Sequence, residues 1–279
     1  MLYAIFVPLI REYTFLNVFT YITFRAAGAA VTAVLLSFLV GPLILRQLKA
    51  RAYHQVVREG TPDSHQSKGT TPTMGGLIIL FCSLVSVLLW ARMTSRYTVL
   101  ALVVTAWMGA IGFLDDVLKL KQKRAGEKNQ GLVERYKLIG QVAIGIFLGW
   151  YLWQFPLSPN LPGASTTLPF YKYVLVVPVA ASFAWIYVLF TTFILVGVSN
   201  AVNLTDGVDG LAAGLSAIAF VTLAVFAYVI GRVDTSRYLG IFYLHNAGEL
   251  TVFCAAMVGA LIGFLWFNAY PAQVFMGDT

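Results

Sequence analysis

Three acid-bearing segments carry side chains suited to chemistry on phosphates. In the first, the carboxylate pair Asp115 and Asp116 ends an apolar run, and Lys119 and Lys123 follow within a basic stretch. If a helix continues beyond this run, the two lysines lie one and two turns past Asp115 on the same face. Carboxylates followed by cations suit a site for a metal ion and a phosphate. The plainer interpretation is a helix end with an Asp115–Lys119 ion pair.

The second segment spaces Asn203, Asp206 and Asp209 three residues apart. On a helical turn these side chains would share one face, and their oxygens are hard ligands of the kind that magnesium prefers. Gly207 and Gly210 permit a tight turn or a close backbone approach. We interpret the segment as functional, although it could also be a turn before the next apolar run, with Asp209 as part of the N-cap.

The third segment, residues 268–279, follows the last apolar run and ends in Gly-Asp-Thr. Asp278 of this segment is a candidate site residue only if the fold brings it close to the other carboxylates. Residues 68–76 combine Lys68, hydroxyl groups and glycines at the expected start of a helix, where free N–H groups and a positive dipole favour a phosphate. Thr-Pro also simply starts helices, so this motif has a structural alternative.

Seven apolar runs must position these segments, and each is long enough to cross the hydrocarbon core. In a bilayer the backbone must satisfy its own hydrogen bonds, and the alternation typical of a membrane barrel is absent, so we predict helices. The predicted fold class is all-α: a polytopic bundle forming one transmembrane domain over residues 1–279, with an aromatic-rich interfacial segment at 1–22. The runs are 26–45, 74–90, 98–114, 138–155, 173–198, 211–230 and 251–267.

The distribution of basic residues predicts the orientation of the bundle. Residues 46–73 and 115–137 contain twelve lysines and arginines, whereas residues 91–97, 156–172 and 231–248 contain five. The positive-inside rule therefore places the first group in the cytosol and the N-terminus outside. Counting crossings from there puts all three acid-bearing segments on the cytosolic face, which predicts one site assembled from several helix ends. His245 and Glu249 then lie outside, as an interfacial polar residue and a helix-start carboxylate.

Composition restricts the class of protein. Hydrophobic residues make up 59% of the 279 residues and charged ones 11%, with a mean hydropathy of +0.78. A water-soluble fold could not bury so much apolar surface. The net charge of +7 lies in loops where topology and anionic lipids explain it, so we do not expect nucleic-acid binding. Cys82 and Cys254 fall in apolar runs and are expected to be small core residues.

Several motifs together resemble the phospho-N-acetylmuramoyl-pentapeptide transferase family, in the polyprenyl-phosphate N-acetylhexosamine-1-phosphate transferase superfamily. The resemblance covers nearly the whole chain. It is carried by Pro72-Thr73-Met74-Gly75-Gly76, Phe113-Leu114-Asp115-Asp116, Arg135-Tyr136-Lys137, residues 200–210, Ala247-Gly248-Glu249-Leu250 and Phe275-Met276-Gly277-Asp278.

The resemblance implies a Mg2+-dependent phosphoglycosyl transferase of peptidoglycan biosynthesis in the bacterial inner membrane. Its reaction moves phospho-MurNAc-pentapeptide from UDP-MurNAc-pentapeptide to undecaprenyl phosphate, which gives lipid I and UMP. Such a reaction needs a membrane groove for the prenyl chain, and a metal and cations to offset phosphate charge. The family also tends to dimerise, so a homodimer is an expectation.

The resemblance further implies roles for individual residues. Asp115 matches the carboxylate proposed as base toward the lipid phosphate, Asp116 a further essential acid, and Asp278 the metal ligand; whether the family uses one displacement or a covalent aspartyl intermediate stays open. Lys119 and Lys123 match cations near the active site. The positions that match the nucleotide-side cleft are Lys68, Thr73, Asn203, Asp206, Asp209 and Asn268. Family members continue beyond the position of Thr279 with further spans and a histidine-bearing loop, so we expect activity of the full-length protein.

Three alternatives remain at this stage. GlcNAc-1-phosphate transferases of other envelope polymers share the aspartates, and the Ala-Gly-Glu-Leu and Pro-Thr-Met-Gly-Gly strings argue against them. Intramembrane aromatic prenyltransferases use two aspartate-rich clusters, which residues 203–209 imitate only in part. An ion-coupled transporter would place its acids at the midplane, whereas the motifs here lie at one face.

Overall fold

The computed structural model describes residues 1–50, 71–124, 134–156, 165–167, 174–176 and 184–278. This part of the chain is helical apart from two three-residue strands that pair antiparallel, with Ser165 opposite Val176. The predicted all-α class is therefore confirmed for the described residues. In chain order the elements are α1 (Leu2–Phe6), the 3-10 helices η1 (Val7–Arg11) and η2 (Thr14–Thr20), α2 (Ile22–Ala50), α4 (Gly76–Trp90), α5 (Arg96–Arg124), α6 (Glu134–Gln154), β1 (Ser165–Thr167), β2 (Val174–Val176), α7 (Ala184–Thr205), α8 (Leu211–Ile230), α9 (Val233–Leu239) and α10 (Glu249–Asn268).

Each of the seven predicted runs coincides with a helix, and five of these helices are long and apolar enough to cross a membrane. Those five are α2, α5, α7, α8 and α10. Helix α4 has only 15 residues, and the glutamine, glycine, tyrosine and tryptophan residues of α6 reduce its hydropathy. Seven crossings and an external N-terminus therefore stay predictions.

One predicted boundary is wrong. The run expected at 173–198 begins too early, because α7 starts only at Ala184 and Val174–Val176 form strand β2. Apolarity alone does not distinguish a strand from a helix end, and the β-branched Val174-Leu175-Val176 triplet suits a strand.

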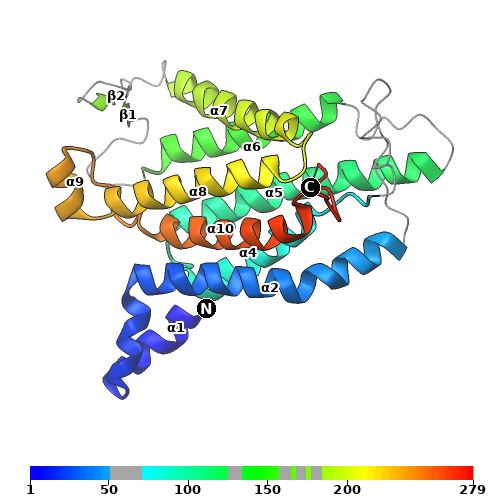
Figure 1. Ribbon diagram of the computed structural model, residues 1–279. Coiled ribbons are helices and arrows are strands. Elements are labelled where there is room, and N and C mark those ends of the chain that lie inside the picture. The colour runs from blue at the N-terminus through cyan, green and yellow to red at the C-terminus, as the bar shows by residue number, and fades with distance from the viewer. Residues whose placement is uncertain (51–70, 125–133, 157–164, 168–173, 177–183, 279) are drawn as a thin grey trace.

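Helix α10 is the centre of the bundle. More than half of its membrane-length window is buried, 56%, against 28% or less in the other four. It packs against α2, α4 and α8 (Figure 1). Glycines make the approach to α2 close, because a Cβ at Gly259 would overlap the Ala30 carbonyl oxygen and one at Gly263 would overlap the Ser37 side chain. Cys82 and Cys254 are free thiols buried in the two apolar clusters around this helix, as predicted.

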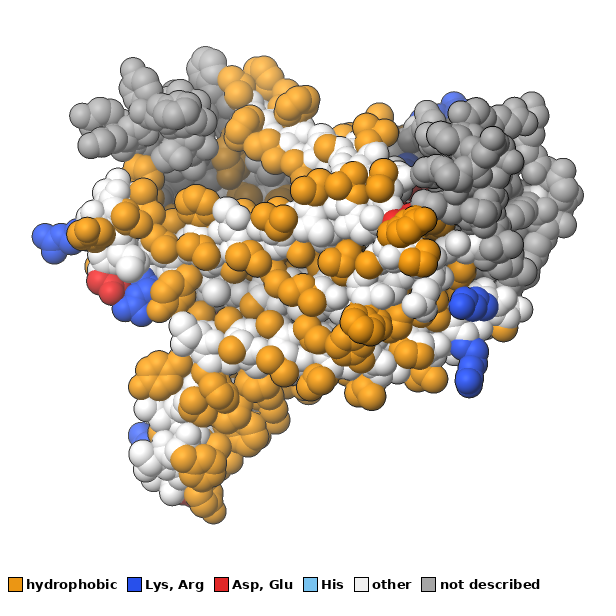
Figure 2. Space-filling model, viewed as in Figure 1, with side chains coloured by type: hydrophobic (Ala, Val, Ile, Leu, Met, Phe, Trp, Pro, Cys, Tyr) orange, Lys and Arg blue, Asp and Glu red, His pale blue; other side chains and the backbone are white. Residues whose placement is uncertain are grey.

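The helices run side by side, and the chain reverses at both ends of the bundle (Figure 1). One end gathers the last turns of α5, α7 and α10 with the first turns of α4, α6 and α8; the other carries α1, α9 and the strand pair. In Figure 2 apolar side chains cover the sides of the helices, and the visible charged groups lie toward the ends. This distribution suits a protein whose sides face lipid.

The N-terminal segment projects from the start of α2 (Figure 1). Its aromatic residues are largely exposed, with Phe15 at 74% and Tyr21 at 57%. Phe19 stacks on Trp90 at a centroid distance of 5.9 Å, so the segment is anchored to α4. The segment thus presents an exposed aromatic surface at one end of the bundle, and its position at the membrane interface stays a prediction.

A buried ion pair ties α2 to α10 at the end away from Asp278. The Arg25 guanidinium donates two hydrogen bonds to the Glu249 carboxylate, at 2.7 and 2.6 Å, and the two side chains are 2% and 6% exposed. The backbone N–H of Arg92 donates to the same carboxylate at 3.2 Å. Glu249 is the first residue of α10, as expected, but its pairing with a residue 224 positions away was not predicted.

Substitution Arg25→Met should destabilise the protein by about 3–5 kcal/mol, because it leaves a carboxylate buried without its cation. The double variant Arg25→Met/Glu249→Met should recover most of this loss. Arg232→Met is the matched control, since its ion pair with Asp234 is exposed and should leave the unfolding midpoint unchanged. Thermal unfolding in detergent measures all three; an unchanged midpoint in Arg25→Met would contradict the role of the pair.

Candidate active site

The predicted carboxylate pair is buried at the end of the bundle that carries the acid-bearing segments. Asp115 is 3% exposed and Asp116 5%. Helix α5 continues past them to Arg124, as expected, and this brings Lys119 Nζ to 2.9 Å from Asp115 Oδ2. Two adjacent carboxylates in this setting repel each other and need positive partners.

Asp278 joins the pair from the other end of the described chain. Its backbone N–H donates to Asp116 Oδ1 at 3.2 Å, and its carboxylate forms an ion pair with Lys119. Asn203 Nδ2 donates to Asp278 Oδ1 at 2.5 Å. The structure therefore brings together the three acids that were predicted as catalytic, and adds one of the predicted cleft residues.

Lys137 is a member of this cluster that the sequence prediction missed as a site residue. Its Nζ lies 3.1 Å from Asp278 Oδ1 and 3.7 Å from Asp115 Oδ2, so it bridges the two segments. Its side chain is only 20% exposed, and burial lowers its pKa although the neighbouring Asp115 carboxylate opposes that shift. Its place within the Arg135-Tyr136-Lys137 string was the signal that could have identified it.

The segment containing Asn203, Asp206 and Asp209 does not form the helical face that its spacing predicted. Helix α7 ends at Thr205, and Gly210 takes a left-handed backbone, φ 76°, before α8. The three side chains instead each form a hydrogen bond with the C-terminal segment. Asn203 donates to the Asp278 carboxylate, Asp206 accepts from the Gly277 N–H, and Asp209 Oδ2 accepts from the Ala272 N–H at 3.2 Å.

The expected N-cap of α8 is wrong, and the surroundings of Asp206 shift its pKa. Asp209 is not the cap of α8, because Gly210 holds that position and no side chain caps it. Burial raises the pKa of Asp206 to about 6; the Asp116 carboxylate adds to this and the Gly277 N–H opposes it. Burial is therefore the main reason that the Asp206 carboxyl group binds a proton more readily than an exposed one.

The start of α4 is also used differently from the prediction. The N–H groups of Gly75 and Gly76 donate to the carbonyl oxygens of Phe275 and Met276 at 2.8 and 2.9 Å. These two amides are therefore occupied by the C-terminal segment and are not free donors for a phosphate. Thr73 lies in this region and is partly exposed, whereas Lys68 and the side chain of Lys123 lie outside the described residues.

Asn268 is a connecting residue in the structure. It is 2% exposed; its Oδ1 accepts from the Gly210 N–H at 3.0 Å and its Nδ2 donates to the Val274 carbonyl at 2.9 Å. Both ends of the amide thus hold backbone segments that surround Asp278. This arrangement favours a positioning role over the direct nucleotide contact that the resemblance implied.

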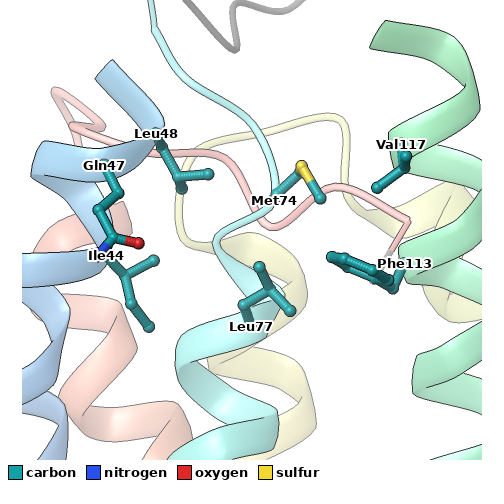
Figure 3. Close-up of a pocket in the computed structure, with 7 residues that line it drawn as sticks. All are labelled: Ile44, Gln47, Leu48, Met74, Leu77, Phe113 and Val117. Carbon is teal, nitrogen blue, oxygen red and sulfur yellow. The ribbon is translucent and has the colours of Figure 1, made fainter. Parts of the chain in front are cut away.

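An apolar pocket of about 130 Å³ lies beside the carboxylates (Figure 3). Phe113 and Val117 of α5 form one wall, and Val117 directly follows Asp116. Met74 and Leu77 form another, and Gln47 is the single polar side chain among the lining residues. Figure 3 shows these side chains converging from α2, α4 and α5 on one space. The site thus adjoins both charged and apolar surfaces.

The donor chemistry of the cluster fits a hard divalent cation. Among the described residues, the ammonium groups of Lys119 and Lys137 each form ion pairs with Asp115 and Asp278, and Asp116 accepts a hydrogen bond from the Asp278 N–H. No group of three or more acidic, histidine or cysteine side chains in metal-binding proximity occurs in that part of the chain. Magnesium commonly uses one or two carboxylates together with substrate phosphates, and Asp278 with Asp116 would provide them.

A polytopic helical bundle with carboxylates and lysines gathered at one end is the arrangement expected of a membrane transferase for phosphate substrates. The family model described as Glycosyl transferase family 4 matches residues 98–279. The phospho-N-acetylmuramoyl-pentapeptide-transferase of Gemmatimonas aurantiaca is 68% identical over 279 residues, which is 100% of this chain and 73% of that protein. The protein of the same name from Syntrophus aciditrophicus is 45% identical, over 100% of this chain and 74% of its own length.

These matches establish the family. A third protein of that name, from Chlorobium chlorochromatii, is 45% identical over 97% of this chain and 70% of its own length. The chain belongs to glycosyl transferase family 4 and, within it, to the phospho-N-acetylmuramoyl-pentapeptide transferases, as its motifs predicted.

Gly277→Ala should disable the site, because Gly277 has φ 81° and a Cβ there would lie 3.0 Å from both Asp116 Oδ2 and the Met74 nitrogen. The left-handed backbone costs about 1–2 kcal/mol for a residue with a Cβ, and displacement of Asp278 should remove transferase activity as well. Gly240→Ala is the matched control, since φ is 63° there but the space is open. Unfolding midpoints and activity distinguish the two; equal activity in both variants would contradict the predicted displacement.

Proposed function

We propose that the protein transfers phospho-MurNAc-pentapeptide from UDP-MurNAc-pentapeptide to undecaprenyl phosphate, giving lipid I and UMP in peptidoglycan biosynthesis. The names of its relatives support this activity. The observation that carries it is the placement of Asp278, between Lys119 and Lys137 and next to Asp115 and Asp116. Carboxylates and ammonium groups interleaved in this way suit an exchange between phosphates.

The reaction is a displacement at the β-phosphorus of the nucleotide sugar. An oxygen of the polyprenyl phosphate forms a bond to that phosphorus, and the bond to the oxygen that bridges to the α-phosphorus breaks. The electron pair of the broken bond leaves with UMP. Negative charge increases on the bridging oxygen in the transition state, so the two ammonium groups stabilise the transition state more than the ground state.

The chain's own residues supply orientation and proton transfer. Asp115, buried and 2.9 Å from Lys119, is the group that we assign as base toward the lipid phosphate. A covalent aspartyl intermediate would need the same buried carboxylate at the same place. Lys137 holds Asp278 and Asp115 in one geometry, and its cation would offset the charge of a phosphate bound beside them.

We further propose Mg2+ as the cofactor, with Asp278 as its main ligand. A bound Mg2+ neutralises phosphate charge and makes the β-phosphorus more electrophilic. Asp278 suits this role because its carboxylate is 14% exposed, whereas that of Asp115 is 4% exposed. Asn203, whose amide lies at Asp278 Oδ1, fixes the orientation of that carboxylate.

The membrane supplies the second substrate. The five apolar helices suit a multi-pass protein, and we propose the bacterial inner membrane with the site at the cytosolic face, where the nucleotide is available. The apolar pocket lined by Phe113 and Val117 would accept prenyl units of the acceptor while its phosphate lies at the carboxylates. We also propose a homodimer, because the family that the chain resembles tends to dimerise.

The full-length enzyme in detergent, with both substrates and Mg2+, should release UMP, and Asp115→Asn and Asp278→Asn should each lower the rate by at least about 10²-fold. Chelation of the metal should have a similar effect. Asp234→Asn, at an exposed position on α9, is the control and should retain the wild-type rate. Release that survives both active-site substitutions would reject these residues as catalytic.

Substrate exchange separates the proposal from its alternatives. UDP-MurNAc-pentapeptide should support UMP release and UDP-GlcNAc should not, because the enzyme must recognise the lactyl-peptide part of its donor. Turnover of UDP-GlcNAc alone would indicate a GlcNAc-1-phosphate transferase. Solute uptake into proteoliposomes without UMP release would indicate a transporter.

A further inference from the structure

One face of α6 carries a stripe of residues spaced four apart, and those that follow Lys137 contact or closely approach α7. Its members are Lys137, Gln141, Gly145 and Gly149. Helices α6 and α7 run antiparallel and pack chiefly on each other, side by side in Figure 1. The stripe therefore leads along the interface from the far end of the bundle to the active site.

The two glycines set the distance between the helices. A Cβ at Gly145 would lie 2.9 Å from the Thr192 Cα, and one at Gly149 would lie 2.8 Å from the Val188 Cα. Because the opposing atoms are backbone, no side-chain rotation could relieve the overlap. Glycine contacts of this kind bring helices close but leave a smooth surface that does not by itself fix how far one helix slides along the other.

Gln141 fixes the axial position of α6 relative to α7, that is, the register of the two helices, which the glycines leave undetermined. It is 2% exposed; its Nε2 donates to Ser199 Oγ at 3.2 Å and its Oε1 accepts from Asn200 Nδ2 at 3.0 Å. A buried amide paired on both sides with the neighbouring helix has only one favourable axial position, since any slide leaves polar groups unpaired in an apolar setting. None of the mechanistic steps above uses Gln141.

The register matters because both helices deliver a group to the same oxygen. Lys137, one turn from Gln141, and Asn203, one turn from Asn200, both contact Asp278 Oδ1, at 3.1 and 2.5 Å. A lysine ammonium sits on a flexible four-carbon stem, so its position in the site depends on where the backbone of α6 is held. A small slide of α6 on α7 would separate the two donors.

We propose that Gln141 is a positioning residue for the transfer reaction, which locks α6 to α7 through Ser199 and Asn200 so that Lys137 and Asn203 converge on Asp278. This inference rests on the proposed function of the site. It adds a residue outside the charged cluster on which the alignment of that cluster depends.

The test compares Gln141→Leu with Gln154→Leu in the full-length enzyme. Gln154 is exposed at the other end of α6 and provides the same substitution on the same helix as a control. Gln141→Leu should lower kcat per folded molecule by roughly 10-fold to 100-fold, as expected for misplacement of a catalytic group by up to about 1 Å. Its unfolding midpoint should lie below that of the control, because Ser199 loses its buried hydrogen-bond partner. In a Lys137→Met background it should cause no further loss, because its effect passes through Lys137.

A second measurement does not depend on activity. Amine-reactive labelling followed by mass spectrometry should show faster modification of Lys137 in Gln141→Leu than in the wild type, while the exposed Lys121 reacts equally in both. Unchanged labelling of Lys137, or a fall in the unfolding midpoint with unchanged kcat per folded molecule, would overturn the proposal. If the wild type released no UMP, the proposed function would fail while the labelling result still tested the register.

Discussion

Like-charge repulsion among carboxylates at the end of a membrane bundle is the constraint around which this structure is arranged. Asp115 and Asp116 are adjacent on one helix and nearly inaccessible to solvent, and the backbone N–H of Asp278 donates a hydrogen bond to Asp116. In a low-dielectric setting such groups cannot all be ionised without cations held close by. Lys119 and Lys137 supply that charge from two different helices. This cluster of buried carboxylates and lysines is the setting in which we propose that a metal-dependent phosphate transfer takes place.

The rest of the fold holds the segments that carry these charged groups in fixed positions. The C-terminal segment returns along the start of α4, where two backbone hydrogen bonds fix Phe275 and Met276. Asn268 and Asp209 attach the same segment to the turn between α7 and α8. At the opposite end of the bundle from Asp278, the buried ion pair of Arg25 and Glu249 joins α2 to α10. The Arg25–Glu249 pair thus joins helices at one end of the bundle, whereas the charged cluster at the other end is the one for which we propose a chemical role.

Sequence predicted the parts of this arrangement that are local. Hydropathy located the helices, and topology brought Asp115, Asp116 and Asp278 to one end before any contact was known. The i, i+4 pairing of Asp115 with Lys119 also follows from helix geometry alone. The features of the site that could not be predicted from the sequence depend on contacts between distant segments. Lys137 contacts Asp115 and Asp278, and Gln141 pairs with residues of α7. The spacing of Asn203, Asp206 and Asp209 suggested a helical face, but the helix ends at Thr205. The amides of Gly75 and Gly76, expected to be free, are occupied by a segment about 200 residues away.

The central claim is that Asp278, held by the two lysines, is where metal and nucleotide meet. The most direct test is binding of Mn2+, a spectroscopic substitute for Mg2+, measured by electron paramagnetic resonance on the full-length enzyme with and without UDP-MurNAc-pentapeptide. The account predicts a nucleotide-dependent Mn2+ site in the wild type and in Asp234→Asn, and its loss in Asp278→Asn. Equal Mn2+ occupancy in Asp278→Asn and the wild type would contradict it.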